Sequence, residues 1–482
     1  MDRAEQHDVT DGRTLVAGVD SSTQSTKIVV CDAQTGQVVR TARAPHPDGT
    51  EVHPDRWWEA YEHACGDGVL DGVTAIAVGG QQHGMVTLDE DDTVVRDALL
   101  WNDTRSAGAA RDLTTELGGV SAWVDAVGLV PVASFTVTKL RWLAEHEPDL
   151  AARVARVVLP HDWLTGRILQ RGNGFERWST DRGDASGTGY WSAADGDYRL
   201  DLLDRAFGRT LEVPEVLSPA QAAGRTADGL LVAAGTGDNM GAALGLTLHP
   251  GDVVVSLGTS GTVFTPHGSA IRDETGAIAG FADATGHHLP LMCTLNAARV
   301  LTAAASMLGV DLAELDRLAL QTIPGAGGLT LLPYLDGERT PDLPEATGTL
   351  SGLTRTNATS ENLARAAVEG MLCNLVAGVD ALRDHDVEVG RILLIGGAAA
   401  SRAVREIAPG LFRAPVVVPA PAEYVGVGAA RQAAWALSGE ADPPTWALAI
   451  DPEYAVPPPG DEQAHADVVA RYQDLVSRTH RV

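Results

Sequence analysis

The stretch Thr14-Leu-Val-Ala-Gly-Val-Asp20, Ser21-Ser-Thr-Gln-Ser-Thr-Lys27, Ile28-Val-Val-Cys31 sets the pattern for this chain. Two short apolar runs flank a turn of Ser and Thr hydroxyls that ends in a cation, and a third apolar run follows around Val38-Val39. Apolar runs that alternate with short turns predict three consecutive antiparallel strands. The hydroxyl-rich turn is suited to hold a phosphate, but it also suits an ordinary hairpin, and this stretch alone favours neither.

The same pattern starts afresh in the second half of the chain. Asp252 to Leu257 predicts a strand, Gly258-Thr259-Ser260-Gly261 a turn, and Thr262 to Phe264 a second short strand. Two such copies indicate an internal repeat with two hydroxyl-rich turns facing each other. We therefore predict a first domain over residues 14–246, a second over 247–440, and a tail over 441–482 with one helix.

Helices and strands alternate through the remainder, which is typical of the α/β class. Strands are expected at Val73–Val78, Leu329–Leu332 and Arg391–Ile395. Helices are expected at Arg56–Ala64, Lys139–His146, Asn296–Leu308, Asn362–Leu382, Val425–Leu437 and Glu462–Ser477, with another opened by Leu159-Pro160-His161-Asp162. The segment Trp178–Thr188 has no periodicity and is expected to be an ordered loop.

Composition restricts the function. The chain has 482 residues, 44% of them hydrophobic, which suits a folded protein with two domains. Its net charge of −28 argues against nucleic-acid binding. No apolar run is long enough to span a membrane, and Met1–Arg13 lacks the hydrophobic region of a signal peptide. The four cysteines are scattered without paired spacing, so we expect reduced thiols and a cytoplasmic location.

Candidate ligand residues lie in two segments of the first half. Gln82 and His83 come directly after Val73–Val78 and a Gly-Gly pair, the usual ligand position of an α/β sheet. Asp238 is a single acid among small residues and glycines in Ala233–Ala243, where the backbone can approach a ligand closely. In isolation, a core histidine and a helix N-cap are the favoured interpretations of His83 and Asp238.

Together these features indicate a phosphotransferase. Phosphoryl transfer needs N–H and O–H donors around the phosphates, an acid that holds Mg²⁺, and a carboxylate that accepts the proton of the attacking hydroxyl. The two hydroxyl-rich turns, the Gly396-Gly397 pair and Asp238 supply this set. The sequence contains no P-loop motif and no protein-kinase motif set, so we predict an α/β phosphotransferase of another type.

Several spaced motifs resemble one superfamily. Gly18–Lys27 resembles the first phosphate loop of the actin/hexokinase/Hsp70 superfamily. Ser134–His146, and Gly348–Leu353 followed by Asn362–Glu369, resemble the two signatures of the FGGY carbohydrate kinases. With Ser256–Gly261 and Pro333–Pro341, the resemblance covers nearly the whole chain. It implies two ribonuclease-H-like (actin-like ATPase) domains with a central cleft, ATP and Mg²⁺ as ligands, and a homodimer.

Within that family, the segments around Gln82-His83, Trp101–Asp103 and Asp238-Asn239 are most similar to members that phosphorylate xylulose. The resemblance implies that Asp238 is the proton acceptor and that Asp20 organises the metal ion. The sugar-binding residues it implies are Gln82, His83, Trp101, Asn102, Asp103 and Asn239. Those implied for ATP are Thr23, Ser25, Lys27, Gly258, Thr259, Gly396 and Gly397. The expected reaction converts D-xylulose to xylulose 5-phosphate.

Three positions depart from the family pattern. Ser22 stands where the first loop usually has Gly, Gln82 replaces a commoner Met, and the turn after Gly397 is less rich in glycine. Two other functions therefore stay open. One is a kinase of the same fold acting on ribulose, gluconate, glycerol or another polyol. The other is a non-catalytic, nucleotide-gated protein, which the presence of Asp238 and of the Gln82-His83 pair disfavours.

Overall fold

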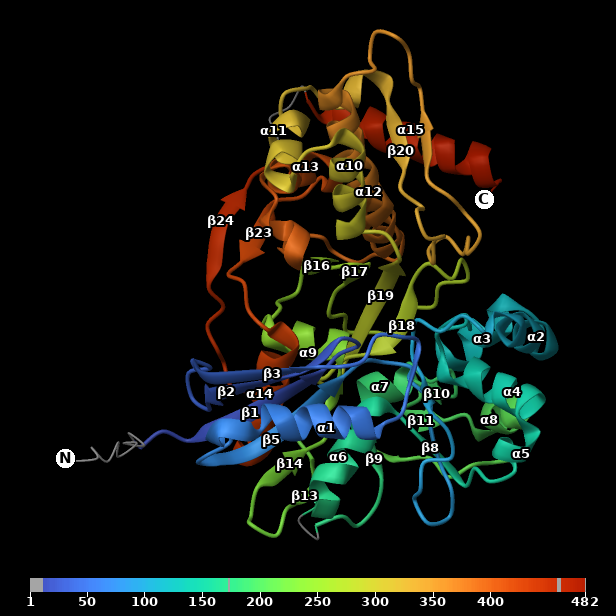
Figure 1. Cartoon of the computed structure of the whole chain (residues 1–482), viewed down its shortest axis with the longest axis vertical. Helices are drawn as coiled ribbons and strands as arrows, with labels where there is room; N and C mark the ends of the chain where they lie inside the picture. The colour runs from blue at the N-terminus through green and yellow to red at the C-terminus, as the bar shows by residue number, and fades with distance from the viewer. Residues whose placement is uncertain (1–11, 172–173, 457–460, 482) are drawn as a thin grey trace. The chain divides into compact units, whose positions relative to one another are not determined.

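The computed structural model describes residues 12–171, 174–456 and 461–481 (Figure 1). They form two compact units. Unit 1 comprises the described residues up to Thr247, with Phe281–His288 and Ala422–Ala447, and unit 2 comprises the rest. Because compactness in space and division along the chain are different criteria, the boundaries expected at residues 246 and 440 stay a prediction.

The central sheet of unit 1 contains the opening strands. Its order is β13 (Ala222–Arg225), β14 (Leu231–Ala233), β5 (Val73–Gly80), β1 (Leu15–Ser21), β2 (Ser25–Asp32) and β3 (Val38–Pro45), and β15 (Thr236–Gly237) also pairs with β5. The predicted antiparallel run β1-β2-β3 is confirmed. Strand β5 runs parallel to β1, β14 and β15, so the carboxyl ends of these four strands lie at one edge of the sheet.

Both faces of this sheet are buried, as the continuous apolar runs require. Side chains alternate along β1, so Ala17 and Val19 belong to one apolar cluster, with Trp57 of α1 (Asp55–Ala64), and Val16 to another. The second cluster includes Ala429 of α14 (Tyr424–Ser438), which packs on β1 and β5 although it lies near the end of the chain (Figure 1).

Gly18 explains how closely α14 approaches. A Cβ atom at this position would lie 1.8 Å from the Gly426 carbonyl oxygen and 2.4 Å from the Ala430 nitrogen. Only glycine leaves space for the helix backbone there.

Unit 2 repeats the arrangement. Its sheet includes, in order, β19 (His288–Thr294), β17 (Gly261–Phe264), β16 (Asp252–Leu257), β22 (Arg391–Ile395), β23 (Val416–Pro419) and β24 (Ile450–Tyr454). Strand β16 is antiparallel to β17 and parallel to β22, as β1 is to β2 and β5. The predicted internal repeat, and with it the two-domain ribonuclease-H-like fold, is confirmed.

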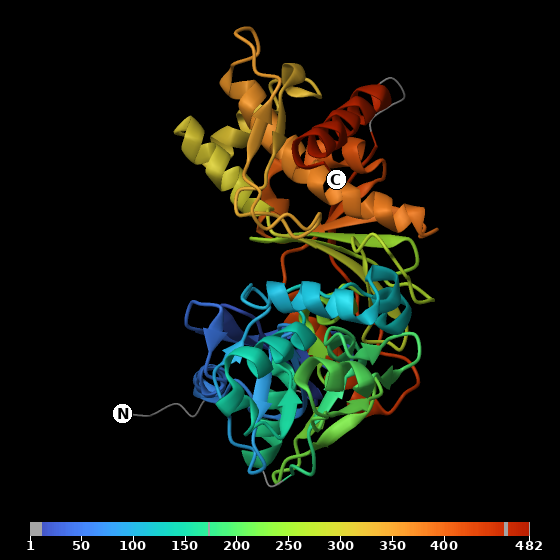
Figure 2. The same ribbon diagram turned by 90° about the vertical axis from the view of Figure 1, so that its right-hand side faces the viewer.

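Helices surround the second sheet. The long helix α12 (Ser360–Asp384) begins after Thr359, whose hydroxyl accepts a hydrogen bond from the Asn362 N–H at 3.3 Å. Helix α15 (Glu462–His480), red in Figure 2, packs against α12 and α13 (Arg402–Phe412). Among the described residues, no helix is long and apolar enough to cross a membrane.

One expectation about local structure is wrong. The predicted loop Trp178–Thr188 contains β9 (Ser179–Asp181) and the short helix α7 (Arg182–Ser186). Asp181 caps this helix by accepting hydrogen bonds from the N–H groups of Gly183, at 2.7 Å, and Asp184, at 3.0 Å. Its residues are buried almost all round, so the sequence shows no helical alternation of apolar and polar positions.

Candidate active site

The predicted site residues of the first half lie at the parallel edge of unit 1. In the β1–β5 pairing Asp20 is opposite Gly79, and in the β15–β5 pairing Gly237 is opposite Gly80. The chain then leaves β5 toward Gln82 and His83, and it leaves β15 directly into Asp238. Ligands of α/β sheets bind at such an edge. The structure therefore brings together three segments that are far apart in the sequence.

Asp20 has a buried carboxyl group. Its Oδ2 lies 3.2 Å from Lys27 Nζ, while its Oδ1 is buried without a hydrogen-bond partner in the described chain. Burial raises the pKa of Asp20, and the positive charge of Lys27 opposes that shift. A carboxylate oxygen that lacks a donor suits a hard cation such as Mg²⁺, so the residues present fit the expected metal ion.

Lys27 is half-buried and pairs with two carboxylates. Its Nζ also lies 2.6 Å from Glu423 Oε2, and the two carboxylates raise the pKa of Lys27 in spite of its partial burial. No motif indicated Glu423, which is about 400 residues away in the chain. Lys27 thus lies beside the metal-binding candidate Asp20, and its predicted contact with phosphate stays a prediction.

Asp238 begins helix α9 (Asp238–Gly245). The N-cap is Gly237, so the interpretation of Asp238 as the cap is wrong. Its Oδ1 accepts hydrogen bonds from the Asn239 backbone N–H at 2.8 Å and from Asn239 Nδ2 at 2.9 Å. Desolvation and the nearby charge of Asp20 raise the pKa of Asp238 to about 7, although the Asn239 hydrogen bonds oppose the shift. A carboxyl group with this pKa can accept a proton near neutral pH.

Gln82 connects Asp238 to the end of β5. Asn239 Nδ2 donates to Gln82 Oε1 at 3.3 Å, and Gln82 Nε2 donates to the Gly183 carbonyl at 3.5 Å. A Cβ atom at Gly237 would lie 3.0 Å from Gln82 Cγ, so the glycine makes space for this side chain. Three predicted site residues therefore form one continuous hydrogen-bonded chain.

His83 is held in an unusual conformation. Its φ of 68° lies in the left-handed region, where strain is tolerated mainly at functional sites. The Nδ1 atom lies 2.7 Å from the Gly187 carbonyl oxygen, and the ring packs edge-on against Phe135 with centroids 4.8 Å apart. A buried, hydrogen-bonded ring also fits the core-histidine interpretation, so the predicted contact with sugar stays a prediction.

The segment Trp101–Asp103 lies beside the first turn. Trp101 Nε1 donates to Thr23 Oγ1 at 2.9 Å, which links a predicted sugar residue with a predicted phosphate residue. The side-chain oxygen of Asn102 is buried and accepts no hydrogen bond from the rest of the described structure. The neighbouring Ser25 is buried too. The hydrogen bond to Thr23 places Trp101 beside the turn that follows the strand of Asp20.

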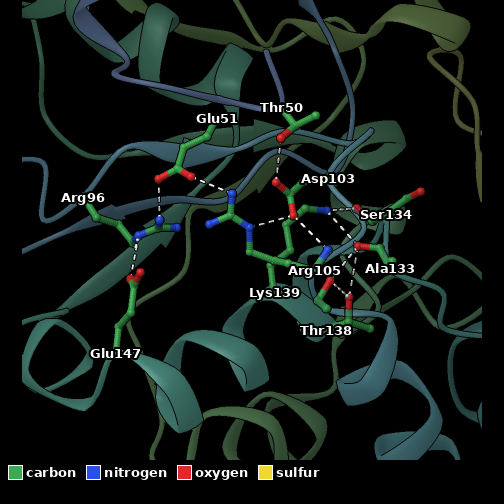
Figure 3. Close-up of polar contacts among 11 residues, drawn as sticks. Thr50, Glu51, Arg96, Asp103, Arg105, Ala133, Ser134, Thr138, Lys139 and Glu147 are labelled. Carbon is green, nitrogen blue, oxygen red and sulfur yellow. Dashed lines mark hydrogen bonds and ion pairs between the residues drawn. The ribbon is translucent and has the colours of Figure 1, made fainter.

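Asp103 is occupied by protein contacts (Figure 3). Its Oδ1 accepts from the backbone N–H of Arg105 at 3.0 Å and from Arg105 Nε at 2.9 Å, and its Oδ2 accepts from Thr50 Oγ1 at 2.8 Å. These hydrogen bonds outweigh burial and lower the pKa of Asp103. The carboxylate shapes its own loop, and its predicted contact with sugar stays a prediction.

A wider network supports that loop. Glu51 lies 2.6 Å from both Arg105 Nη2 and Arg96 Nη2, and Arg96 Nε lies 2.9 Å from Glu147 (Figure 3). Lys139, on α4 (Thr136–His146), is fully buried and donates to the carbonyls of Ala133, at 3.2 Å, and Ser134. Lys139 therefore fixes backbone next to the loop.

In unit 2, the predicted nucleotide residues also share a strand edge. Ser256 of β16 is opposite Ile395 of β22, so the Gly258-Thr259 turn and the Gly396-Gly397 turn follow neighbouring parallel strands. Gly396 has a φ of 87°, and a Cβ atom there would lie 2.6 Å from the Leu257 carbonyl carbon. The glycine is required for this close approach.

Sequence reasoning missed Glu338, which lies in the quoted segment Pro333–Pro341 but received no role. Its side chain is buried, and its Oε1 accepts from the N–H groups of Leu295, at 2.6 Å, and Arg339, at 2.8 Å. Its Oε2 accepts from the amide groups of Asn296 and Asn374. The next residues, 297 and 298, donate their N–H groups to the carbonyls of Thr259 and Gly258, so Glu338 supports the turn.

Comparison with known proteins agrees with this geometry. The model of the N-terminal domain of the FGGY family of carbohydrate kinases matches residues 15–245, and that of the C-terminal domain matches 253–437. A xylulose kinase of Streptomyces coelicolor is 48% identical over 88% of this chain and 89% of its own length. For a xylulose kinase of Haemophilus influenzae the identity is 32%, over 89% and 92%.

Solved structures agree as well. The crystal structure of xylulose kinase from Bifidobacterium adolescentis has a TM-score of 0.87 and 46% identity, covering 95% of this chain and 99% of that one. Glycerol kinase from Plasmodium falciparum with ADP has a TM-score of 0.84 at 16% identity, with coverage of 97% and 98%, and at that identity it supports the fold alone.

Proposed function

Since this chain belongs to the FGGY family of carbohydrate kinases, we propose that it transfers the γ-phosphoryl group of ATP to the terminal hydroxyl of D-xylulose, giving xylulose 5-phosphate. The observation that carries the proposal is the position of Asp238, at the same strand edge as Asp20 and hydrogen-bonded through Asn239 to Gln82. The name of the relative that is 48% identical over most of the chain supports xylulose as the sugar.

Asp238 is the general base of the proposed mechanism. It takes the hydroxyl proton as the sugar oxygen attacks the γ-phosphorus and the bond to the β-phosphate oxygen breaks. A base of this kind contributes about 10²–10⁴-fold to the rate. The hydrogen bonds from Asn239 fix the carboxyl group, and its raised pKa makes it a competent acceptor near neutral pH.

The remaining residues bind and orient. Mg²⁺, bound with ATP, neutralises charge on the phosphates, and Asp20 would hold it through its unpartnered Oδ1. We assign sugar contacts to the six predicted residues at the edge of unit 1: Gln82, His83, Trp101, Asn102, Asp103 and Asn239. We assign ATP to Thr23, Ser25, Lys27, Gly258, Thr259, Gly396 and Gly397. A cytoplasmic location and a homodimer remain part of the proposal.

The test is a coupled assay of ADP release on the purified enzyme with ATP and Mg²⁺. The panel contains D-xylulose, D-ribulose, gluconate and glycerol. We expect the highest kcat/KM with D-xylulose. If no member of the panel raises ADP release above the rate without sugar, the kinase assignment fails; if another member leads, only the sugar assignment changes.

A further inference from the structure

A buried cluster of four ionisable side chains lies in unit 1, and the proposed mechanism does not use it. His161 is on helix α6 (Pro160–Arg171), and its ring is fully buried. Its Nδ1 lies 2.7 Å from Asp162 Oδ1 and 3.7 Å from Asp184 Oδ2, and its Nε2 lies 3.1 Å from Asp181 Oδ1. All three carboxyl groups are buried as well.

Charge balance determines the protonation state of this cluster. A buried ion is costly unless an opposite charge pairs with it, and three carboxyl groups here surround one ring. Only Nε2 has hydrogen-bond geometry, with Asp181, while Nδ1 lies beside Asp162 and Asp184 without it. Burial opposes a charge on the ring, but the surrounding carboxyl groups raise the pKa of His161 to about 9, so the ring is an imidazolium. Burial raises the pKa of Asp184 well above its usual range, and neither of its oxygens has a hydrogen-bond partner within the described ranges.

His161 contacts two of the segments that form the sugar site, one through its Cβ and backbone and one through its ring. A Cβ atom at Gly80, the last residue of β5, would lie 2.8 Å from His161 Cβ. A Cβ atom at Gly235 would lie 3.0 Å from His161 Cδ2. Gly80 directly precedes the Gln81-Gln82-His83 segment, and Gly235 is three residues before Asp238. His161 is therefore in close contact with the backbone that leads into the Gln82-His83 pair and into Asp238.

Asp181 connects the ring to the third segment. The carboxylate that receives the Nε2–H also caps α7, through the N–H groups of Gly183 and Asp184. The carbonyl of Gly183 accepts from Gln82, and the carbonyl of Gly187, which follows the helix, lies 2.7 Å from His83 Nδ1. A displacement of Asp181 would therefore move the carbonyl groups that hold the side chains of Gln82 and His83.

We propose that His161 is a positioning residue of the sugar site: its imidazolium, held between Asp162 and Asp181, fixes Gly235 and the start of α7, while its backbone and Cβ lie against Gly80. The proposal deepens the function above and rests on it. His161 does not touch the sugar; it acts through the three segments that place Gln82, His83 and Asp238.

One other occupant has to be weighed. Ligand atoms of His161, Asp162 and Asp184 lie within 4.8 Å of one another, which would also suit a metal ion. Nδ1 and Asp162 Oδ1 are 2.7 Å apart, and neither atom has a hydrogen-bond partner within the described residues, so they would suit a cation as well as an ion pair with a protonated ring. Metal analysis of the purified protein is therefore part of the test.

The experiment compares three variants of the full chain. His161→Asn removes the positive charge, and His161→Lys keeps it. His465→Asn is the matched control, because His465 is also buried and hydrogen-bonded, with Nδ1 2.9 Å from the Asp461 carbonyl, but lies on α15 in unit 2. For each, kcat and the KM values for D-xylulose and ATP are measured, together with hydrogen exchange of peptides covering 181–187 and 235–239.

We expect His161→Asn to lower kcat/KM for the sugar about 100-fold, the size expected for a misplacement of about 1 Å, with KM for ATP within about twofold of wild type. Exchange should accelerate in both peptides. His161→Lys should recover kcat/KM to within about tenfold of wild type, and His465→Asn should stay within about twofold. If His161→Asn is insoluble, the lysine variant decides alone: folded and active supports the proposal, folded and inactive overturns it.

Three results would overturn the proposal. The first is a folded His161→Asn variant with wild-type kcat, KM and exchange. The second is equal impairment of the asparagine and lysine variants, because charge would then not be the cause. The third is a stoichiometric metal ion in the wild-type protein that His161→Asn loses. Failure of the wild-type enzyme on the sugar panel would refute the proposed function instead, and hydrogen exchange would still test the positioning role.

Discussion

Replacing Asp238 with Asn should have opposite effects on activity and stability. The pKa of Asp238 is raised from 3.8 to about 7 in the folded protein, chiefly by desolvation. Between these values the folded state binds more protons than the unfolded state, so the free energy of unfolding decreases as the pH rises through this window. The full shift corresponds to at most about 4 kcal/mol, and solvent screening of the partly exposed side chain reduces it to about 2 kcal/mol.

In Asp238→Asn the side chain cannot ionise, so the variant does not lose this free energy of unfolding as the pH rises. At pH 8 we expect Asp238→Asn to be more stable than wild type, with a Tm higher by about 4–8 °C, and at pH 5, about one unit above the unfolded pKa, the difference should shrink to about 40% of that. Its kcat should fall by about 10²–10⁴-fold, the usual contribution of a general base. Thermal unfolding of the ligand-free protein from pH 5 to pH 8, and the coupled assay at saturating D-xylulose and ATP, measure the two effects.

Asp103→Asn is the matched control, because hydrogen bonds lower the pKa of Asp103. That carboxylate stabilises the fold above the pKa it has in the unfolded chain, and the stabilisation is lost as the pH falls through the folded value. The control should therefore be less stable than wild type at pH 8. The reasoning about Asp238 is refuted if its variant keeps kcat within tenfold of wild type, or if its stability relative to wild type does not increase between pH 5 and pH 8.

Three further substitutions test individual contacts. Trp101→Phe removes the donor to the Thr23 hydroxyl, and the loss of about 0.5–1.5 kcal/mol should raise the KM for D-xylulose, for ATP or for both by about 2–10-fold in the coupled assay. Unchanged KM values for both substrates would show that this hydrogen bond orients neither of them. Glu338→Gln leaves at least one buried donor of unit 2 unsatisfied, so KM for ATP should rise and the protein should lose about 1–3 kcal/mol in denaturant unfolding, with KM for the sugar unchanged. Gly187→Ala places a Cβ atom 2.7 Å from the neighbouring histidine ring, so KM for D-xylulose should rise about tenfold, whereas Gly268→Ala, where nothing lies within 4 Å, should match wild type.

Strands and their ends could be predicted because the signals are local. The apolar runs before Asp20 and Gly258 specify β1 and β16, and polar residues at a strand's carboxyl end indicate a ligand whatever the rest of the fold is. Glu338 and His161 could not be assigned in this way. Glu338 contacts Leu295, more than 40 positions away, and His161 contacts Gly235, more than 70 positions away. No periodicity in the sequence records such contacts.

The repeat in this chain duplicates a scaffold but not the chemistry. In each unit a strand, a hydroxyl-rich turn and an antiparallel strand lie beside a parallel partner, so both units offer a strand edge that approaches a ligand closely. At the edge of unit 1 the side chains are ionisable, with Asp20, Lys27 and Asp238. The predicted turns of unit 2 present glycine and hydroxyl groups instead. Backbone N–H groups can hold phosphates at either edge, but proton transfer requires a titratable side chain, so our proposal assigns the proton transfer to unit 1. The positioning role that we propose for His161 belongs to the same unit, because its contacts with Gly235 and Asp181 hold backbone next to the side chains that carry those titratable groups.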